Sequence, residues 1–260
     1  NFQGLRLEGV NSASIQAIET QDLAVLTTNQ LVDGLTEANI IGLSTTQIRS
    51  LVVNQLNQLE TRDFNALLSA QIQALSTDQV LGLDEIRLAA SSTANIRGLT
   101  SSAIAAIPTS RLSAIEAEDF AVLASSQMSG FTSSQIGLIV SNNQSRFPLT
   151  VDNVKGLTTQ QLSLFPGSYI RNLSTSAVSG LLESQVAALS TEQVAGLVDG
   201  NRLANLTSAN VSGLNLGGLT VVGIPYSIGV LEARGLISAL STESVATIST
   251  SVFFKLPNYV

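Results

Sequence analysis

The sequence predicts an all-α fold, an α-solenoid (superhelix) of tandem eight-residue short-helix repeats. From Leu43 to Leu83 a leucine returns at every eighth residue, and the residue five places after each leucine is apolar. A serine or threonine often follows the leucine, with glutamine three residues later. A strand would alternate apolar and polar residues, whereas this spacing is typical of a helix start. A strict short period of this kind indicates a repeat array.

Within each eight-residue unit, here called an octad and numbered from its leucine, local signals predict one short helix. In residues 43–50, Ser44 can cap the helix, Gln47 can bond back to the cap, and the two apolar residues form a hydrophobic staple. At the eighth position a short helix must stop and a left-handed residue can be required. Glycine fills that position at Gly82, Gly98, Gly130, Gly156, Gly180, Gly196 and Gly213. Proline fills the second position, where a missing amide costs least, at Pro108, Pro166 and Pro257.

A single octad is too short to hold its helix alone, because isolated helices need about 12–15 residues even when the sequence is favourable. Successive octads must therefore stack and share a continuous core of Leu, Ile and Val. We expect a zigzag of short helices around that core, with two octads forming one layer of the solenoid.

The octad register divides the chain into two stretches. It runs through residues 1–140 and is then lost at 141–148, a polar segment that we predict to be a loop or break. It resumes at Leu149 and continues through 149–260, with a Gly-rich interruption at 215–235. The segment 141–148 fits a loop inside one continuous solenoid as well as it fits a domain boundary.

The composition argues against several classes of function. A net charge of −7 and a pI near 4.5 argue against binding to nucleic acid or to anionic lipid. The chain has no cysteine and no histidine, which removes the thiolate nucleophile, the commonest general base and the commonest zinc ligand. No convergent set of catalytic groups is visible, so we expect no enzymatic activity and no cofactor. A hydrolase that uses a pair of carboxylates remains formally possible, because acids alone suffice for that chemistry.

One uncharged stretch, residues 214–231, has about the length of a membrane span. Asn215, Pro225 and four glycines weaken that interpretation, because such residues interrupt apolar helices. We therefore expect no membrane span.

Candidate modification sites are the four N-glycosylation sequons, which begin at Asn143, Asn172, Asn205 and Asn210. Asn143 is the best candidate because it lies in the predicted loop. In the sequons of Asn172 and Asn205 the hydroxyl residue is a predicted helix cap, and Asn210 falls inside a predicted helix. About four sequons are expected by chance in a chain so rich in Ser and Thr, so their number does not indicate secretion.

Acidic residues offer the only candidate metal ligands. Glu116, Glu118 and Asp119 cluster in one octad, whereas Asp33 and Asp199 lie beside glycines where the register slips. A calcium site is conceivable there. Solvated acids, some of them favoured by a helix dipole, are the better interpretation, and we predict no metal site.

Octads of the form L-[ST]-x-x-Q/E-[ILV]-x-[AG], interrupted by a polar segment that leads into a proline, resemble those of the mesothelin, stereocilin and otoancorin family. Residues 141–162 and 173–197 carry the likeness best. The resemblance implies a superhelical array in an extracellular or surface-attached glycoprotein that works in adhesion or matrices. The chain departs from that family in lacking cysteine and in its more regular, Ser/Thr-rich octads. Similar runs occur in very long bacterial surface proteins.

Together these features favour a non-enzymatic extracellular or cell-surface glycoprotein, structural or adhesive, that self-assembles into a fibre or matrix. The expected partners are further copies of the chain or other extracellular and surface glycoproteins. One alternative is a recognition module whose concave face binds a protein or glycan, and another is a bacterial surface-repeat spacer. The scarcity of aromatic and Arg anchors favours the structural interpretation.

Overall fold

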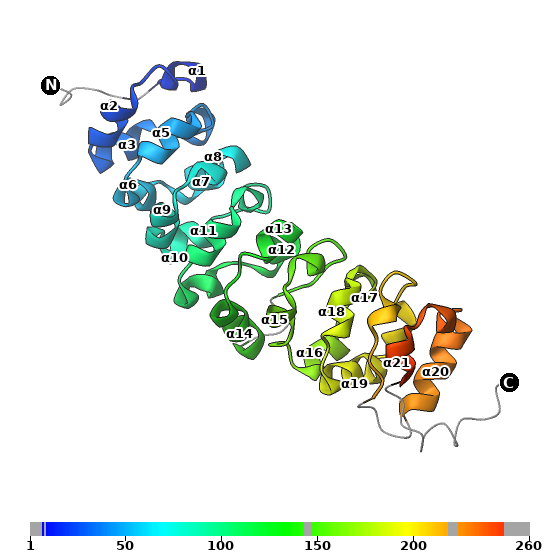
Figure 1. Ribbon diagram of the computed structural model, residues 1–260. Helices are drawn as coiled ribbons and strands as arrows, with labels where there is room; N and C mark the ends of the chain where they lie inside the picture. Colours follow the sequence, from blue (N-terminus) through cyan, green and yellow to red (C-terminus); the bar gives the residue numbers. More distant parts are fainter. Residues whose placement is uncertain (1–6, 8, 143–146, 218–222, 247–260) are drawn as a thin grey trace. The chain divides into compact units, whose positions relative to one another are not determined.

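The computed structural model describes residues 7, 9–142, 147–217 and 223–246 (Figure 1). Every regular element in these residues is an α-helix or a 3-10 helix, and none is a strand. The helices are short, and they pack against helices that are distant in the sequence. The predicted all-α solenoid of short-helix repeats is therefore confirmed. The chain forms two compact units, residues 1–131 and 132–260.

The first unit contains α1 (Ser12–Ile15), α2 (Thr20–Val25), α3 (Thr28–Gly34), α4 (Glu37–Ile40), α5 (Thr45–Ser50), α6 (Val53–Gln58), α7 (Thr61–Asn65), α8 (Ser69–Ala74), α9 (Thr77–Gly82), α10 (Glu85–Ala89), η1 (Ile96–Gly98), α11 (Ser101–Ala106), η2 (Thr109–Ala114), α12 (Ala117–Ala121) and α13 (Ser125–Met128). The second contains α14 (Ser133–Asn142), η4 (Val154–Gly156), α15 (Thr159–Leu162), α16 (Gly167–Arg171), α17 (Thr175–Gly180), α18 (Glu183–Ala187), α19 (Thr191–Asp199), η5 (Leu203–Asn205), η6 (Val211–Gly213), α20 (Gly223–Ala233), η7 (Ile237–Ala239) and α21 (Thr242–Ala246).

The helices begin where the octad predicts. At α5 the Gln47 amide donates to Ser44 Oγ (3.2 Å), and the Ser44 amide donates to Gln47 Oε1 (2.8 Å). The same reciprocal pair begins α9, α15 and α19. Pro108 and Pro166 are the cap residues of η2 and α16, as predicted, whereas Pro257 lies outside the described residues. Local capping therefore sets the start of those helices that carry the Ser/Thr and Gln pair.

One turn of the solenoid, here called a coil, takes between three and four octads. Each helix packs on the helix three octads further along, such as α1 on α4, α2 on α5 and α5 on α8. The side chains at the fifth octad position reach further, to backbone four octads earlier. The prediction of two octads per layer is therefore wrong, because an octad finds its neighbours three and four units away.

The fifth-position side chain joins each coil to the one before it. The Nε2 of Gln79 donates to the carbonyl oxygens of Ile48 (3.0 Å) and Leu51 (2.7 Å), while its Oε1 accepts from the Ser76 amide (2.8 Å). These carbonyls lie at the end of α5, where backbone groups lack regular partners within the helix; the Ile48 carbonyl also accepts from the Leu51 amide (3.3 Å). Paired bonds of this kind are made by Gln47, Gln55, Gln71, Gln79, Gln127, Gln185, Gln193 and Asn210. All eight side chains are buried.

The glycines at the eighth position serve close packing rather than a left-handed stop. Among the described glycines only Gly9 and Gly235 have a positive φ, so the predicted reason is wrong. A Cβ at Gly98 would lie 2.0 Å from the carbonyl oxygen of Ser69, and one at Gly130 would lie 2.4 Å from that of Ser101. No side chain fits such a gap, so glycine lets the backbones of successive coils approach.

Both segments that interrupt the octad pattern contain helical residues. Helix α14 runs through Asn142, so the first two residues of the predicted break at 141–148 are helical, and 143–146 lie outside the described residues. Within the predicted interruption at 215–235, residues 223–233 form α20, an 11-residue helix, while 218–222 lie outside the described residues. Of the helices in the described part, none is both long and apolar enough to cross a membrane.

Replacing Gln79 by alanine should lower the free energy of unfolding by about 2–4 kcal/mol, because the Ser76 amide and the carbonyls of Ile48 and Leu51 each lose a buried hydrogen bond. The control is Gln73→Ala on the exposed face of α8, which should change it by less than about half a kcal/mol. Chemical denaturation measures both variants. Equal losses would show that the inter-coil bonds contribute nothing beyond helix propensity.

Replacing Gly98 by alanine should lower the free energy of unfolding by about 1–3 kcal/mol, since the added methyl group forces two backbones apart. Gly137→Ala in α14 is the control, because a Cβ there meets no atom within 4 Å. That variant should gain up to about 1 kcal/mol from helix propensity. A Gly98→Ala protein as stable as the unaltered chain would contradict the close approach of the coils.

Candidate functional site

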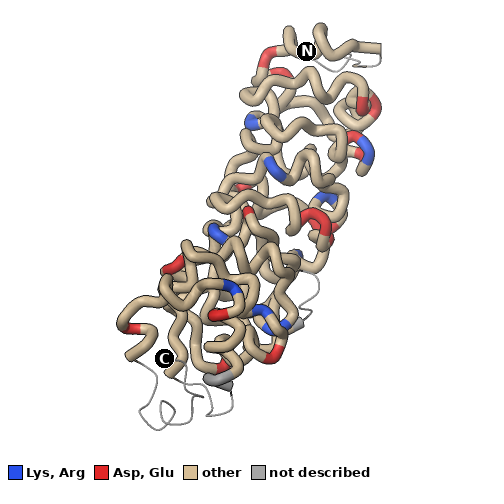
Figure 2. The backbone as a smooth tube through the Cα atoms, turned by 90° about the vertical axis from the view of Figure 1, so that its right-hand side faces the viewer, with Lys and Arg blue, Asp and Glu red and all other residues tan. Residues whose placement is uncertain are grey.

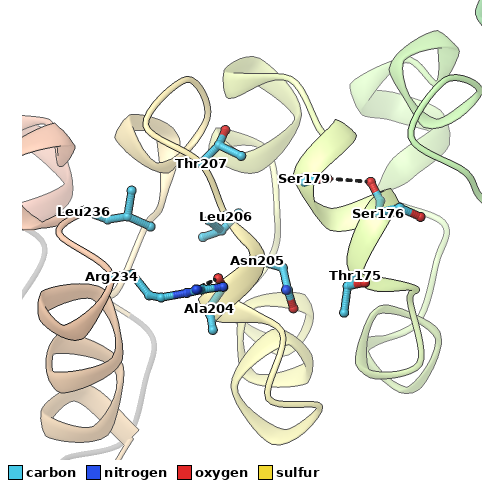
Figure 3. A pocket seen from close by; sticks show the side chains of 9 residues that line it. All are labelled: Thr175, Ser176, Ser179, Ala204, Asn205, Leu206, Thr207, Arg234 and Leu236. Atoms are coloured by element: carbon cyan, nitrogen blue, oxygen red, sulfur yellow. Dashed lines mark hydrogen bonds between the residues drawn. The ribbon is translucent and has the colours of Figure 1, made fainter.

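A polar groove in the second unit is the best candidate for a binding site (Figure 3). It has a volume of about 400 Å³ and is lined by three segments, 175–179, 204–207 and 234–236, one from each of three successive coils. The side chains that line it are those of Thr175, Ser176, Ser179, Ala204, Asn205, Leu206, Thr207, Arg234 and Leu236. No carboxylate is among them.

Two left-handed residues help to shape this region. Helix α20 ends with a Gly235 φ of 68°, and the Leu236 amide bonds back to the Leu231 carbonyl (2.8 Å). Helix α19 ends in the same way at Asn201, φ 55°, with the Arg202 amide bonded to the Leu197 carbonyl (2.7 Å). Both are the helix-ending motif that favours glycine or asparagine. The left-handed turn at Gly235 places Arg234 and Leu236 at the groove.

Arg234 supplies the only charge in the groove. Its Nε donates to the carbonyl oxygen of Ala204 (2.8 Å), and Figure 3 shows the side chain extended across the groove toward that residue. Arg202, one coil earlier, bonds to the Leu173 carbonyl through its own Nε in the same way (2.5 Å). The sequence showed these arginines as isolated charges, because their carbonyl partners are about 30 residues away.

The four sequons lie in different surroundings. Asn210 is buried, and its Nδ2 donates to the carbonyls of Val178 (3.2 Å) and Leu181 (2.9 Å). Asn172 is exposed and donates to the Ser168 carbonyl (2.9 Å). Asn205 is half-buried in the groove. Asn143 lies outside the described residues, so glycosylation there stays a prediction.

The acidic residues do not gather into a metal site. Glu116 and Glu118 are exposed, as are Asp33 and Asp199. Within the part of the chain that the structure describes, no three acidic side chains lie close enough together to hold a metal ion. Asp119 is buried instead, because it occupies a fifth octad position. The fifth octad position therefore explains why Asp119 is buried, whereas membership of an acidic cluster does not.

Two buried carboxylates, Asp63 and Asp119, stand where other octads carry an amide. An ionised carboxylate cannot donate to carbonyls as glutamine does. Burial raises the pKa of Asp63; the Arg62 guanidinium opposes the rise and the Glu60 and Glu37 carboxylates add to it, while a hydrogen bond from the Glu37 amide lowers it. Burial likewise raises the pKa of Asp119, against a hydrogen bond from the Glu116 amide. Asp63 Oδ1 is buried without a hydrogen-bond partner.

Charge is distributed unequally between the units. Thirteen of the nineteen acidic residues but only six of the twelve basic residues fall within 1–131, so the first unit carries the whole net charge of −7. The second unit is neutral by the same count. Figure 2 shows the charged residues dispersed along the backbone rather than gathered in one patch. An anionic ligand would therefore meet less repulsion at the second unit.

Replacing Asp63 by asparagine should raise the free energy of unfolding at neutral pH by about 1 kcal/mol, because an amide can be buried uncharged and can donate to a carbonyl. In the unaltered protein the folded-state pKa lies above the unfolded one, so stability rises as the pH falls from neutral through the folded pKa toward about 4. Asp63→Asn should reduce this rise in denaturation experiments across pH. Asp78→Asn, at an exposed carboxylate, should leave it unchanged. A pH profile unaltered by Asp63→Asn would contradict the assignment.

Comparison with known proteins identifies a repeat family in part of the chain. The model of a family described as the ALTTAQ repeat matches residues 56–85, which run from within α6 to the first residue of α10. No curated protein matches the chain. The matched segment is about as long as one coil of the solenoid, so this part of the chain carries a recognised repeat.

Proposed function

We propose that this chain is a non-enzymatic structural segment of an extracellular or surface-attached repeat protein, and that copies associate into a fibre or matrix. The observation that carries the proposal is the use of the buried polar side chains. Gln79 and the other buried amides at the fifth octad position donate to two carbonyls of the preceding coil and so join one coil to the next. These bonds stabilise the array along its length. They also engage the buried amides, so few buried polar groups are left to form a catalytic site.

The surface supports the same proposal. The charged residues are only 12% of the chain, and hydroxyl side chains cap many of the helices, as at α5, α9 and α19. Low charge weakens the repulsion between copies of the chain. The array of short capped helices supports the proposed relation to mesothelin, stereocilin and otoancorin, and with it an adhesive or matrix role.

Three exposed apolar side chains are candidate contacts between copies. Val52, Leu68 and Leu182 stand at the second octad position, where many octads have Ser or Thr, and they are 50%, 50% and 44% exposed. None of them can accept the cap hydrogen bond, so each costs helix stability at its position. A contact with another copy would explain why apolar residues stand there.

A recognition module is the second candidate, and one observation favours it. The groove beside Arg234 gathers polar side chains from three coils, and several of them have no hydrogen-bond partner among the residues that the structure describes. The sequence suggests a recognition module that binds its ligand on a concave face; here we restrict the hypothesis to this groove.

Negative-stain electron microscopy and sedimentation at several concentrations test the structural proposal. We expect filaments or concentration-dependent oligomers, which the triple variant Val52→Ser, Leu68→Ser and Leu182→Ser should shorten or abolish. Its free energy of unfolding should rise, because each new cap stabilises a helix by about 0.5–2 kcal/mol. Loss of assembly without loss of stability would thus locate the contacts. Monomers at every concentration would refute self-assembly.

A further inference from the structure

The groove beside Arg234 offers hydrogen-bond donors that the protein does not use. The Nε of Arg234 donates to the Ala204 carbonyl (2.8 Å), and among the residues that the structure describes its two terminal nitrogens have no hydrogen-bond partner. That single bond fixes the base of the guanidinium and leaves its outer edge open. A guanidinium edge matches the two oxygens of a carboxylate in a bidentate pair.

The rest of the polar lining is uncharged. The side-chain hydroxyls of Thr175 and Thr207 and the side-chain amide of Asn205 make no hydrogen bond with any residue in the described part of the chain. Ser179 Oγ donates to the Ser176 carbonyl (2.9 Å), which leaves its lone pairs free to accept. Hydroxyl and amide groups can both donate and accept, as the hydroxyls of a sugar do.

We propose that this groove binds a carboxylate-bearing sugar, a uronic acid or a segment of an acidic polysaccharide. Arg234 would pair with the carboxylate, and Thr175, Asn205 and Thr207 would bond to the ring hydroxyls. Leu206 and Leu236 line the groove but are almost fully buried, at 4% and 9% exposure, so they form its apolar floor rather than a broad stacking surface. The site is independent of self-assembly, because it lies within one copy and one unit.

Other ligands fit the groove less well. Phosphorylated and strongly acidic peptides are usually held by several arginines, whereas this groove has one cation. A neutral sugar usually stacks on an aromatic side chain, and none lines the groove. A polar groove in the first unit provides a contrast, since Glu19 lines it and would repel an anion.

Titration of the whole chain with D-glucuronate, followed by NMR or calorimetry, tests the proposal. We expect a Kd of about 1–10 mM, as one ion pair and a few hydrogen bonds allow, with weaker binding in high salt. D-glucose has the ring hydroxyls but no carboxylate, and acetate has the carboxylate but no ring hydroxyls. Each should bind at least about tenfold more weakly than glucuronate. Oligomeric uronate should bind more tightly than the monosaccharide if the groove accepts a chain.

Arg234→Gln should abolish binding, and Arg234→Lys, which keeps the charge but not the fork, should weaken it. Arg202→Gln is the matched control, because it removes the same kind of Nε–carbonyl bond and one positive charge outside the groove. It should bind glucuronate as the unaltered chain does. Equal loss in both Gln variants, acetate or glucose binding as well as glucuronate, or tighter binding of a tetraglutamate peptide would each overturn the proposal.

Discussion

The bond between a fifth-position amide and two carbonyls of the preceding coil is the interaction on which this structure depends. Gln193 is an example. Its buried side chain accepts from the amide of Ser190, the cap residue of α19, and donates to the carbonyls of Leu162 and Phe165. Helices this short have a large share of backbone groups without an internal partner. The amide supplies partners at the start of one helix and the end of another, so local and long-range order are coupled through a single residue.

Much of the local structure could be predicted from the sequence, because its causes lie within eight residues. Ser44 and Gln47 form the capping box that their spacing indicates. The partners of Gln47 across the coil, Ile15 and Ile18, could not be predicted, since a period of eight does not say how many octads close a turn. For the same reason the sequence suggests a helix stop as the reason for Gly98 and does not show its contact with Ser69.

The candidate site shows the same division between near and distant causes. Asn210 was named as part of a sequon, but its burial follows from its equivalence to the glutamines at the fifth position, a signal that was present in the octad alignment. Asp119 was grouped with its acidic neighbours rather than with those amides. Arg234 carried no local signal at all, because the groove forms only when segments about 30 residues apart meet.

A coil that takes between three and four octads makes the solenoid comparable to an α-helix in which each octad plays the part of one residue. The packing of α2 on α5 and the bond from Gln55 in α6 to Leu23 in α2 correspond to neighbours three and four positions apart. Insertion or deletion of one octad during evolution would therefore rotate all later surface by about a quarter to a third of a turn. Changes of three or four octads would bring a binding face back near its original side, and changes of seven would return it more nearly, as happens for residues on a helix.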